Sequence, residues 1–129
     1  MSVFTDAERA YLQSEARLAR VATVGKDGTP HVVPFGWSFN AGEDVIEIGG
    51  LDLDRTKKYR DVSRTGRAAV VVDDIASLDP WRVRGVEVRG RAEALSEPRP
   101  LIRIHPERIV SWGIESEAIG RRHARTVES

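Results

Sequence analysis

The stretch LARVATVGKDGTPHVVPFGW, residues 18–37, decides the fold of this chain. Its first part alternates apolar and polar residues and is rich in β-branched side chains, a pattern typical of a strand. Lys26-Asp27-Gly28 is a strong hairpin-turn signal, because Asp-Gly readily adopts the backbone of a tight turn. A return strand follows over 29–39, and Pro30 and Pro34 place parts of it at a sheet edge or a bend. The stretch therefore predicts an antiparallel β-hairpin.

Four more strands and two helices are expected along the rest of the chain. Asn40-Ala41-Gly42 turns the hairpin into a third strand, and the later strands are rich in valine and isoleucine. The expected strands lie over 17–25, 29–39, 44–50, 67–74, 81–95 and 107–114, and the expected helices over 5–16 and 55–63. This set predicts a mainly β fold, a small six-stranded antiparallel barrel with short flanking helices.

The helix ends carry recognisable capping residues. Glu8 stands three residues after Thr5, the spacing of a capping box, so the first helix is expected to start at Thr5. Asp54 is the candidate N-cap of the second helix. Thr65-Gly66 is a turn signal that is expected to end it.

The stretch 81–95 contains a slip in its alternation. Val83 occupies an odd position, whereas Val86 and Val88 occupy even ones. One extra residue in this strand would return all three valines to a single apolar face. Because glycine in a strand often marks a bulge, the pattern predicts a β-bulge at Gly85.

Length and composition bound the class of protein. With 129 residues the chain is expected to form one domain over 1–129, with a polar, loose tail over 115–129. The chain has no cysteine, no signal-peptide pattern and no long apolar run, so we expect a cytoplasmic protein. Its 20 basic and 20 acidic residues balance, which argues against general nucleic-acid binding.

Four cations are concentrated in RTKKYRDV, residues 55–62. The cluster follows a strand that ends in Gly49-Gly50 and stands at a helix start, where free backbone N–H groups favour an anion. A solvated helix face is the more common origin of such a charge run, because most such runs are exposed. The residues alone leave both interpretations open.

Other polar and aromatic residues also allow two interpretations. Arg82, Arg84, Arg89 and Arg91 form either an exposed sheet face or a set of partners for the carboxylates of a ligand. The three tryptophans, Trp37, Trp81 and Trp112, suit core or interface packing, and stacking on a planar cofactor is the alternative. The three histidines lack metal-ligand spacing, so no metal site is expected. No nucleophile motif and no nucleotide-binding glycine loop appears in the sequence.

Four segments carry a resemblance to a known family: LARVATVGKDGTPHVVPFGW, VIEIGG, RTKKYRDV and VRGVEVRGRAEAL. In the order and spacing of these segments, the chain resembles the pyridoxamine 5′-phosphate oxidase-like superfamily of flavin and deazaflavin proteins. The closing ERIVSWGI is similar to the short actinobacterial branch that uses coenzyme F420. The resemblance covers about residues 5–114. It implies a split β-barrel of the FMN-binding type, which forms a homodimer with two cofactor sites at the interface.

The resemblance also implies which residues form the site. Lys58 stands at the family's phosphate-binding position, with Arg55, Thr56 and Lys57 beside it, and Arg60 is expected at the solvent or dimer surface. The remaining expected cofactor contacts are His31, Val33, Pro34 and Gly36 on the second strand, Ile48 and Gly49 on the third, and Trp81, Arg82, Arg84 and Gly85 from the partner's side. The family's glutamine near the ring falls at Gly85, so this chain lacks that amide contact.

The expected activity is hydride transfer between F420 and a small electron-poor organic substrate. His31 is a candidate proton donor, and Trp112 is expected to wall the substrate pocket. The family's substrate element at the C-terminal end is replaced by SWGI, which argues against activity on pyridoxamine phosphate. The alternatives are an FMN-binding oxidoreductase or flavin reductase on the same fold, and a non-catalytic cofactor carrier.

Overall fold

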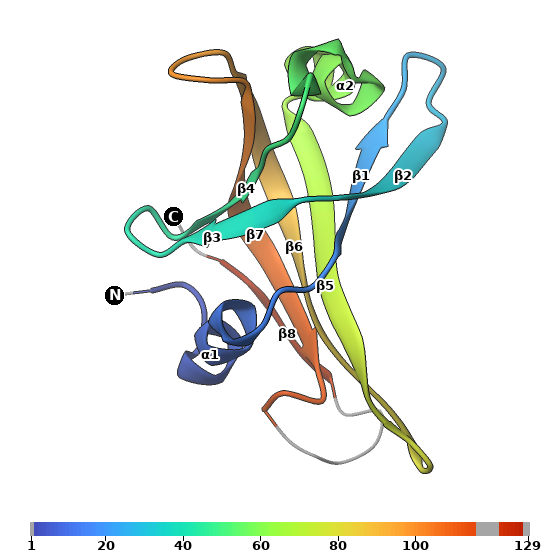
Figure 1. Cartoon of the computed structure of the whole chain (residues 1–129), viewed down its shortest axis with the longest axis vertical. Helices are drawn as coiled ribbons and strands as arrows, with labels where there is room; N and C mark the ends of the chain where they lie inside the picture. Colours follow the sequence, from blue (N-terminus) through green and yellow to red (C-terminus); the bar gives the residue numbers. More distant parts are fainter. Residues whose placement is uncertain (1, 116–121, 128–129) are drawn as a thin grey trace.

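The structure is a computed structural model that describes residues 2–115 and 122–127. Its elements are α1 (Asp6–Ser14), β1 (Ala19–Val24), β2 (Pro30–Phe35), β3 (Trp37–Asn40), β4 (Val45–Ile48), the 3₁₀ turn η1 (Leu53–Arg55), α2 (Lys57–Thr65), β5 (Arg67–Leu78), β6 (Trp81–Leu95), β7 (Leu101–Trp112) and β8 (Arg122–Thr126). The two helices lie toward opposite ends of the molecule, with α2 at the top of Figure 1 and α1 below β3.

The strands form one antiparallel sheet that curls into a half-barrel. Their order is β2-β1-β5-β6-β7-β4-β3, and β8 pairs with β7. The two outermost strands, β2 and β3, follow each other in the chain with only Gly36 between them. The sheet must therefore curl until its two ends meet, and Figure 1 shows β3 crossing in front of the longer strands while β2 lies beside β1. The expected fold, a mainly β split barrel with flanking helices, is confirmed.

The described residues contain eight strands instead of the expected six. The return strand expected over 29–39 bends at Gly36 and becomes β2 and β3, which pair with different neighbours. β7 begins at Leu101, six residues before the expected 107, because Ile102 and Ile104 pair with β4. The last strand, β8, lies in the tail that was expected to be loose.

The core fills the concave side of the curled sheet. The largest fully buried side chains include Ile46, Ile48, Ile102, Ile104 and Ile109, which come from β4 and β7. β1 alternates buried and more exposed residues, as expected for a half-buried strand. Neither helix in the described part of the chain has the length and apolar composition of a membrane-spanning segment.

The observed N-cap residue is the predicted one in α1 and a different one in α2. Thr5 caps α1, and the reciprocal contacts with Glu8 complete the predicted capping box. The second helix is capped by Thr56 and not by Asp54, because Asp54 lies inside η1. The hydroxyl of Thr56 accepts the N–H of Tyr59 at 3.3 Å. α2 ends at Gly66, as expected.

The predicted bulge at Gly85 is wrong. Gly85 pairs in continuous register with Asp73 on one side and Trp112 on the other. The irregularities lie elsewhere: between Ile75 and Ser77 of β5, and beside Gly90 of β6. The pairing register is continuous from Val83 to Val88, so no extra residue moves Val83 to the face of Val86 and Val88. Val83 is exposed, since the far ends of β5 and β6 project beyond the core as an arm (residues 75–83; Figure 1).

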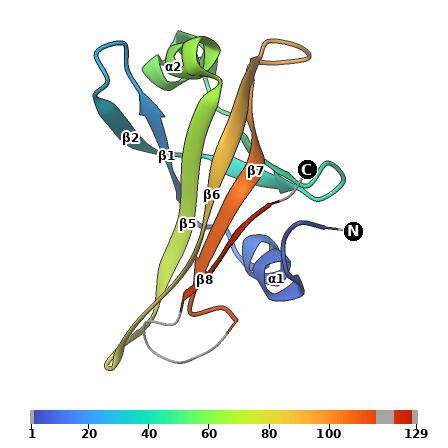
Figure 2. The ribbon, with the colours of Figure 1, turned by 180° about the vertical axis from the view of Figure 1, so that it is seen from behind.

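β8 is held to the sheet and to α1. It pairs with Arg108–Trp112 of β7, and Figure 2 shows it along the lower half of that strand. Arg125 donates hydrogen bonds to both carboxylate oxygens of Glu8, at 3.0 and 2.6 Å, and to the carbonyl of Val3 at 2.6 Å. Glu8 is fully buried. This ion pair explains why the polar tail is ordered over the residues that the structure describes.

Removing Arg125 is expected to destabilise the fold strongly. Arg125→Met leaves the buried Glu8 carboxylate without its partner, at a cost of about 3 kcal/mol in the free energy of unfolding. The double variant Glu8→Gln, Arg125→Met removes both charges and should recover much of this loss. Urea unfolding measures both effects. An Arg125→Met variant as stable as the parent would show that the pair contributes nothing.

The pH dependence gives an independent check on the same pair. Burial opposes the charged form of Glu8, but the hydrogen bonds from Arg125 and from the Thr5 backbone outweigh burial and hold its pKa below the ordinary 4.5. The stability that this carboxylate contributes is therefore present above pH 4.5 and is lost as the pH falls through the lowered pKa. The difference in the free energy of unfolding between the parent and the double variant should therefore become smaller as the pH is lowered through that range.

Candidate functional site

A mainly apolar cavity lies between the β1–β2 hairpin and the start of α2. We call it the α2 cavity. Its volume is about 390 Å³, and its lining residues are Val21, Thr23, His31, Val33, Pro34, Phe35, Thr56, Lys57 and Lys58. The hairpin supplies the apolar wall, and α2 supplies the cations. Such a cavity suits a flat, largely apolar group that carries an anion at one end.

The Gly-Gly end of β4 makes room for the aromatic wall of this cavity. Gly50 has a φ of +156°, and a Cβ atom there would lie 2.3 Å from the Phe35 ring. Any other residue at this position would push the ring away. The ammonium of Lys58 lies 3.5 Å from the centroid of the same ring. Gly50 thus fixes Phe35, and Phe35 positions Lys58 through a cation–π contact.

Lys58 is the unusual residue of the cavity. Its exposed fraction is 7%, and none of the carboxylates in the described ranges lies within 4.0 Å of its ammonium. Burial lowers the pKa of Lys58, because the charged form loses water. A buried lysine usually has a partner, and here the described partner is only a ring face. The cavity is therefore electrostatically prepared for an anion.

The start of α2 adds backbone donors beside Lys58. The first N–H groups of a helix have no acceptor within the helix, and the helix dipole favours a negative charge there. The Thr56 hydroxyl is already engaged, since it donates to the carbonyl of Leu53 at 2.6 Å and accepts the N–H of Tyr59. Its expected contact with a ligand would require it to release Leu53. Lys58 and the helix N–H groups are the stronger candidates.

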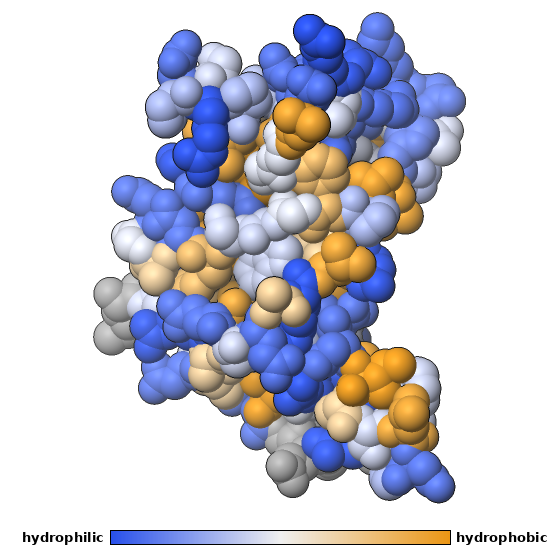
Figure 3. Space-filling view, viewed as in Figure 1, coloured by the Kyte–Doolittle hydropathy of each residue, from blue (hydrophilic) through white to orange (hydrophobic). Residues whose placement is uncertain are grey.

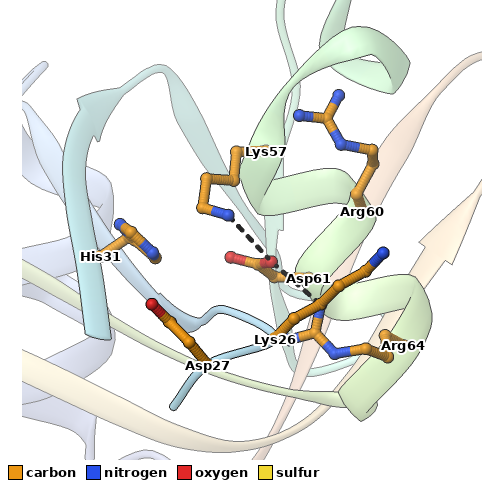
Figure 4. A pocket seen from close by; sticks show the side chains of 7 residues that line it. All are labelled: Lys26, Asp27, His31, Lys57, Arg60, Asp61 and Arg64. Atoms are coloured by element: carbon orange, nitrogen blue, oxygen red, sulfur yellow. Dashed lines mark hydrogen bonds and ion pairs between the residues drawn. The ribbon is translucent and has the colours of Figure 1, made fainter. Parts of the chain in front are cut away.

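A second cavity adjoins the first and is strongly cationic (Figure 4). Its volume is about 600 Å³, and its lining residues are Lys26, Asp27, His31, Lys57, Arg60, Asp61 and Arg64. We call it the cationic cavity. It shares His31 and Lys57 with the α2 cavity, so the two are contiguous. Four cations face two carboxylates, which leaves an excess of positive charge.

Asp61 organises the cationic cavity from beneath. It is buried, accepts a hydrogen bond from the Thr23 hydroxyl at 2.9 Å, and pairs with Arg64 at 3.2 Å and Lys57 at 3.9 Å. Burial opposes its charge, but the hydrogen bonds from Thr23 and Arg64 outweigh it and lower the pKa of Asp61. The carboxylate therefore stays charged and fixes two of the cations. Arg60 and Lys26 carry the remaining positive charge.

The structure brings six of the predicted cofactor residues together: His31, Val33, Pro34, Thr56, Lys57 and Lys58 line the α2 cavity. Gly36 and Gly49 lie next to each other, with an ideal Cβ of Gly36 3.8 Å from the Gly49 carbonyl oxygen. Ile48 is fully buried in the core, so its side chain does not reach the cavity. Arg55 ends η1, and its carbonyl accepts a hydrogen bond from Arg60 at 2.9 Å.

The other predicted residues lie at the opposite end of the sheet. Trp81, Arg82, Arg84 and Gly85 belong to β6 near the arm, and Trp112 pairs with Gly85. None of them lines the α2 cavity or the cationic cavity. A Cβ at Gly85 would lie 2.9 Å from the Asp73 Cβ and 3.0 Å from the Val72 carbonyl oxygen, so a longer side chain does not fit there.

Sequence reasoning missed residues in both cavities. Phe35 shares a face of β2 with His31 and Val33, so alternation alone points to it. Arg60 and Arg64 follow Lys57 at helical spacing, which places all three on one face of α2. Arg60 was expected at the solvent or dimer surface; it is exposed, and it also lines the cationic cavity.

One group of three potential metal ligands also comes together. Ligand atoms of Glu8, Glu115 and His123 lie within 4.8 Å of one another. Arg125 already occupies both oxygens of Glu8 and also contacts the His123 ring nitrogen at 3.2 Å. The group is part of the ion-pair network between α1 and β8, and we assign no metal to it.

The curled antiparallel sheet, with a lysine-lined cavity at the start of α2, is the architecture of a split-barrel protein. The chain belongs to the pyridoxamine 5′-phosphate oxidase family, whose sequence profile matches residues 4–127. It is 43% identical over 133 residues to a 5a,11a-dehydrotetracycline/5a,11a-dehydrooxytetracycline reductase from Streptomyces rimosus, and the match covers 96% of this chain and 93% of that protein.

Solved structures share the fold. The conserved hypothetical protein Rv2991 from Mycobacterium tuberculosis superposes with a TM-score of 0.72 at 21% identity, over 99% of this chain and 94% of that one. An F420 reductase superposes with a TM-score of 0.59 at 23% identity, over 78% of this chain and 94% of that one. At these identities the likeness concerns the fold alone.

The protein without ligand should tolerate loss of the Lys58 charge. Because the pKa of Lys58 is lowered, its charge destabilises the folded state below that pKa, and the penalty vanishes as the pH rises through the ordinary 10.5. Lys58→Met should therefore be at least as stable as the parent at pH 7, with a smaller difference at pH 10. Urea unfolding at both values tests this.

The matched control is Lys26→Met, because Lys26 is exposed and its removal should change stability by less than about 0.5 kcal/mol. A Lys58→Met variant clearly less stable than the parent at pH 7 would mean that the chain itself satisfies the Lys58 charge. In that case the cavity would have no need of an anion.

Proposed function

We propose that this protein is an oxidoreductase, a reductase that uses coenzyme F420 to deliver a hydride to a small electron-poor organic substrate. The observation that carries the proposal is Lys58, a buried cation without a carboxylate partner in the described residues, on the wall of an apolar cavity. The family, the reductase from Streptomyces rimosus and the fold of the F420 reductase support it.

The two contiguous cavities suit a cofactor with a flat ring and several acidic groups. Val33, Pro34 and Phe35 offer apolar surface to a ring system, while Lys58 and the α2 N–H groups suit a phosphate. Beyond the phosphate, F420 carries glutamates, and FMN carries none. The cationic cavity lies where such further carboxylates would be accepted, which favours F420 over FMN.

The chain's part in the reaction is to bind the cofactor and the substrate, to orient them, and to exclude water from the site. Bound F420 supplies a hydride from its ring carbon, and the chemistry belongs to the cofactor. His31 lines both cavities and is the candidate proton donor. The name of the Streptomyces rimosus relative points to an unsaturated ring compound as the substrate class, and we extend this class to the present chain.

We also propose a homodimer. The arm exposes Ile75, Leu78, Trp81 and Val83, of which Leu78 is 74% exposed and Trp81 58%. Figure 3 shows apolar side chains gathered at the end of this arm. Contiguous exposed apolar surface is typical of an interface. In such a dimer, the arm and Trp112 of one chain would complete the substrate side of the other chain's site, as the family resemblance implies.

The first test compares the two cofactors. Purified protein titrated with F420 and with FMN should bind F420 more tightly. Lys58→Ala should weaken F420 binding by about 1–3 kcal/mol, the loss of a charge-assisted contact. The control is Arg99→Ala, because Arg99 is exposed and lines neither cavity. Micromolar binding of FMN without binding of F420 would favour an FMN oxidoreductase instead.

Turnover separates an enzyme from a carrier. In the presence of the protein and a conjugated ring ketone, reduced F420 should be oxidised. The absorbance of F420 follows the reaction. Tight binding of F420 without turnover of any acceptor in a panel of enones and quinones would instead indicate a non-catalytic carrier.

The cationic cavity makes a separate prediction about selectivity. Arg60→Ala should weaken F420 binding and leave FMN binding unchanged, because only F420 extends carboxylates into this cavity. Lys58→Ala should weaken both ligands, since both carry a phosphate. Calorimetric titration of the two variants with the two cofactors gives the four affinities. Equal losses of both ligands in Arg60→Ala would contradict a role in tail recognition.

A further inference from the structure

A third cavity lies beside α1, away from the two cavities at α2. We call it the α1 cavity. It has a volume of about 540 Å³, and its lining residues are Ala7, Ala10, Tyr11, Ser14, Ala76, Arg82, Arg84, Gly113 and Ile114. It shares no residue with the α2 cavity or the cationic cavity.

Small residues keep this cavity open. Ala7, Ala10 and Ser14 stand on one face of α1, at positions i, i+3 and i+7. Across from them lies Ala76, the extra residue of the β5 irregularity. β-bulges re-aim neighbouring side chains and are frequent next to binding sites. The result is a wall without large side chains, against which a flat ring system fits.

The charges around the cavity are unbalanced. Arg84 donates to both oxygens of Asp74, at 3.0 and 2.5 Å, and the Tyr11 hydroxyl donates to the same carboxylate at 2.8 Å. Arg17 lies 3.3 Å from Asp74 as well. The hydrogen bond from Arg84 lowers the pKa of Asp74 to about 2, so this carboxylate stays charged and is fully engaged. Its single negative charge can neutralise only one of the nearby guanidinium groups.

Tyr11 adds no negative charge. Burial and its hydrogen bond to Asp74 raise the pKa of the Tyr11 hydroxyl well above its ordinary value. Two guanidinium groups approach its ring, with Arg17 3.9 Å and Arg84 5.4 Å from the ring centroid. Glu15 approaches Arg17 at 4.0 Å but is largely exposed. The positive charge at the cavity is therefore not cancelled by its neighbours.

Arg82 carries the uncommitted charge. It pairs with Ser77 across the sheet, directly after the irregularity at Ala76. Its side chain lines the cavity and is only partly exposed. Within residues 2–115 and 122–127, no carboxylate lies within 4.0 Å of its guanidinium. A guanidinium beside an open, small-residue wall can bind a carboxylate through two parallel hydrogen bonds.

The geometry points to a binding site for a flat organic acid in the α1 cavity, with the acid group on Arg82 and the ring system against the Ala7–Ala10 face of α1. Arg84 and Tyr11 form the fixed end of the site, because Asp74 holds both of them. Arg82 is the part that is free to bind. The proposal does not rest on cofactor binding at α2, since none of these residues lines the α2 cavity or the cationic cavity. Arg82 and Arg84 were expected to contact the partner's cofactor, but here they line a cavity of their own chain, and Ala76 and Arg82 place it next to the arm of the proposed dimer.

The test is a titration of isotope-labelled protein, without cofactor, followed by NMR. The probe is 2-naphthoate, and the neutral isostere is 2-naphthamide. Naphthoate is expected to shift the amide signals of Ala10, Ala76 and Gly113 saturably and to bind more tightly than the amide. Arg82→Gln should weaken naphthoate about tenfold to a hundredfold, the loss of a charge-assisted pair, and should change naphthamide little.

Two further variants test whether naphthoate binds in the α1 cavity. Ala10→Leu fills the cavity and should weaken both probes, whereas Arg89→Gln removes an exposed arginine that pairs with Glu87 and should weaken neither. Naphthoate is itself a flat anion and can enter the α2 cavity as well, so the two sites are separated by the position of the shifted signals. The proposal is overturned if naphthoate gives no saturable shift at millimolar concentrations, if its shifts lie only at the α2 cavity, or if Arg82→Gln shows the same saturable shifts at Ala10, Ala76 and Gly113 as the parent.

Discussion

The rest of the structure depends on one covalent constraint, the direct connection of β2 to β3 through Gly36. These strands are the two ends of the strand order, so a flat sheet is impossible for this chain. β2 pairs side by side with β1, and curling brings the face of β2 that carries His31, Val33 and Phe35 next to the start of α2. Phe35, the last residue before the connection, then stands against Lys58. The cavity at α2 is thus a direct consequence of how the sheet closes.

The second organising feature is the local separation of charge in a chain whose formal charge is zero. Around α2, four cations meet two carboxylates, one of which is buried beneath them. Around α1, the guanidinium groups of Arg84 and Arg17 meet at Asp74, and Arg82 lines the cavity beside them. Local potentials of this kind attract small anions, while the neutral total gives no long-range field for nucleic acid. The same sequence therefore has a net charge of zero and two local regions of excess positive charge.

Local signals in the sequence were sufficient for the parts of the fold that local chemistry determines. The turn at Lys26-Asp27-Gly28 and the capping box at Thr5 both appear as predicted. The class of fold also follows from the strands. The start of β7 does not follow, because it is fixed by pairing with β4, a strand more than fifty residues away. β8 depends likewise on a distant contact, between Arg125 and Glu8.

The candidate site shows the same division. The position of Lys58 at a helix start could be inferred from the chain, and so could the face of β2 that carries His31 and Val33. The cationic cavity could not, since Lys26 belongs to a hairpin turn and Arg60 to a helix that meet only in the folded chain. The parity of Val83 was misinterpreted as a bulge, because the arm has no core to bury it.

β7 has a position in the sheet that bears on how the molecule opens. It pairs with β6 along one edge, and with β4 and then β8 along the other. β2, by contrast, pairs only with β1 within the described part of the chain. Amide groups that are hydrogen-bonded on both sides of a strand exchange with solvent only in large openings, whereas an edge strand opens locally. The hairpin that forms the α2 cavity thus stands at an edge of the sheet, where local opening costs less than opening at β7, so the cavity wall can move while the centre of the sheet stays closed.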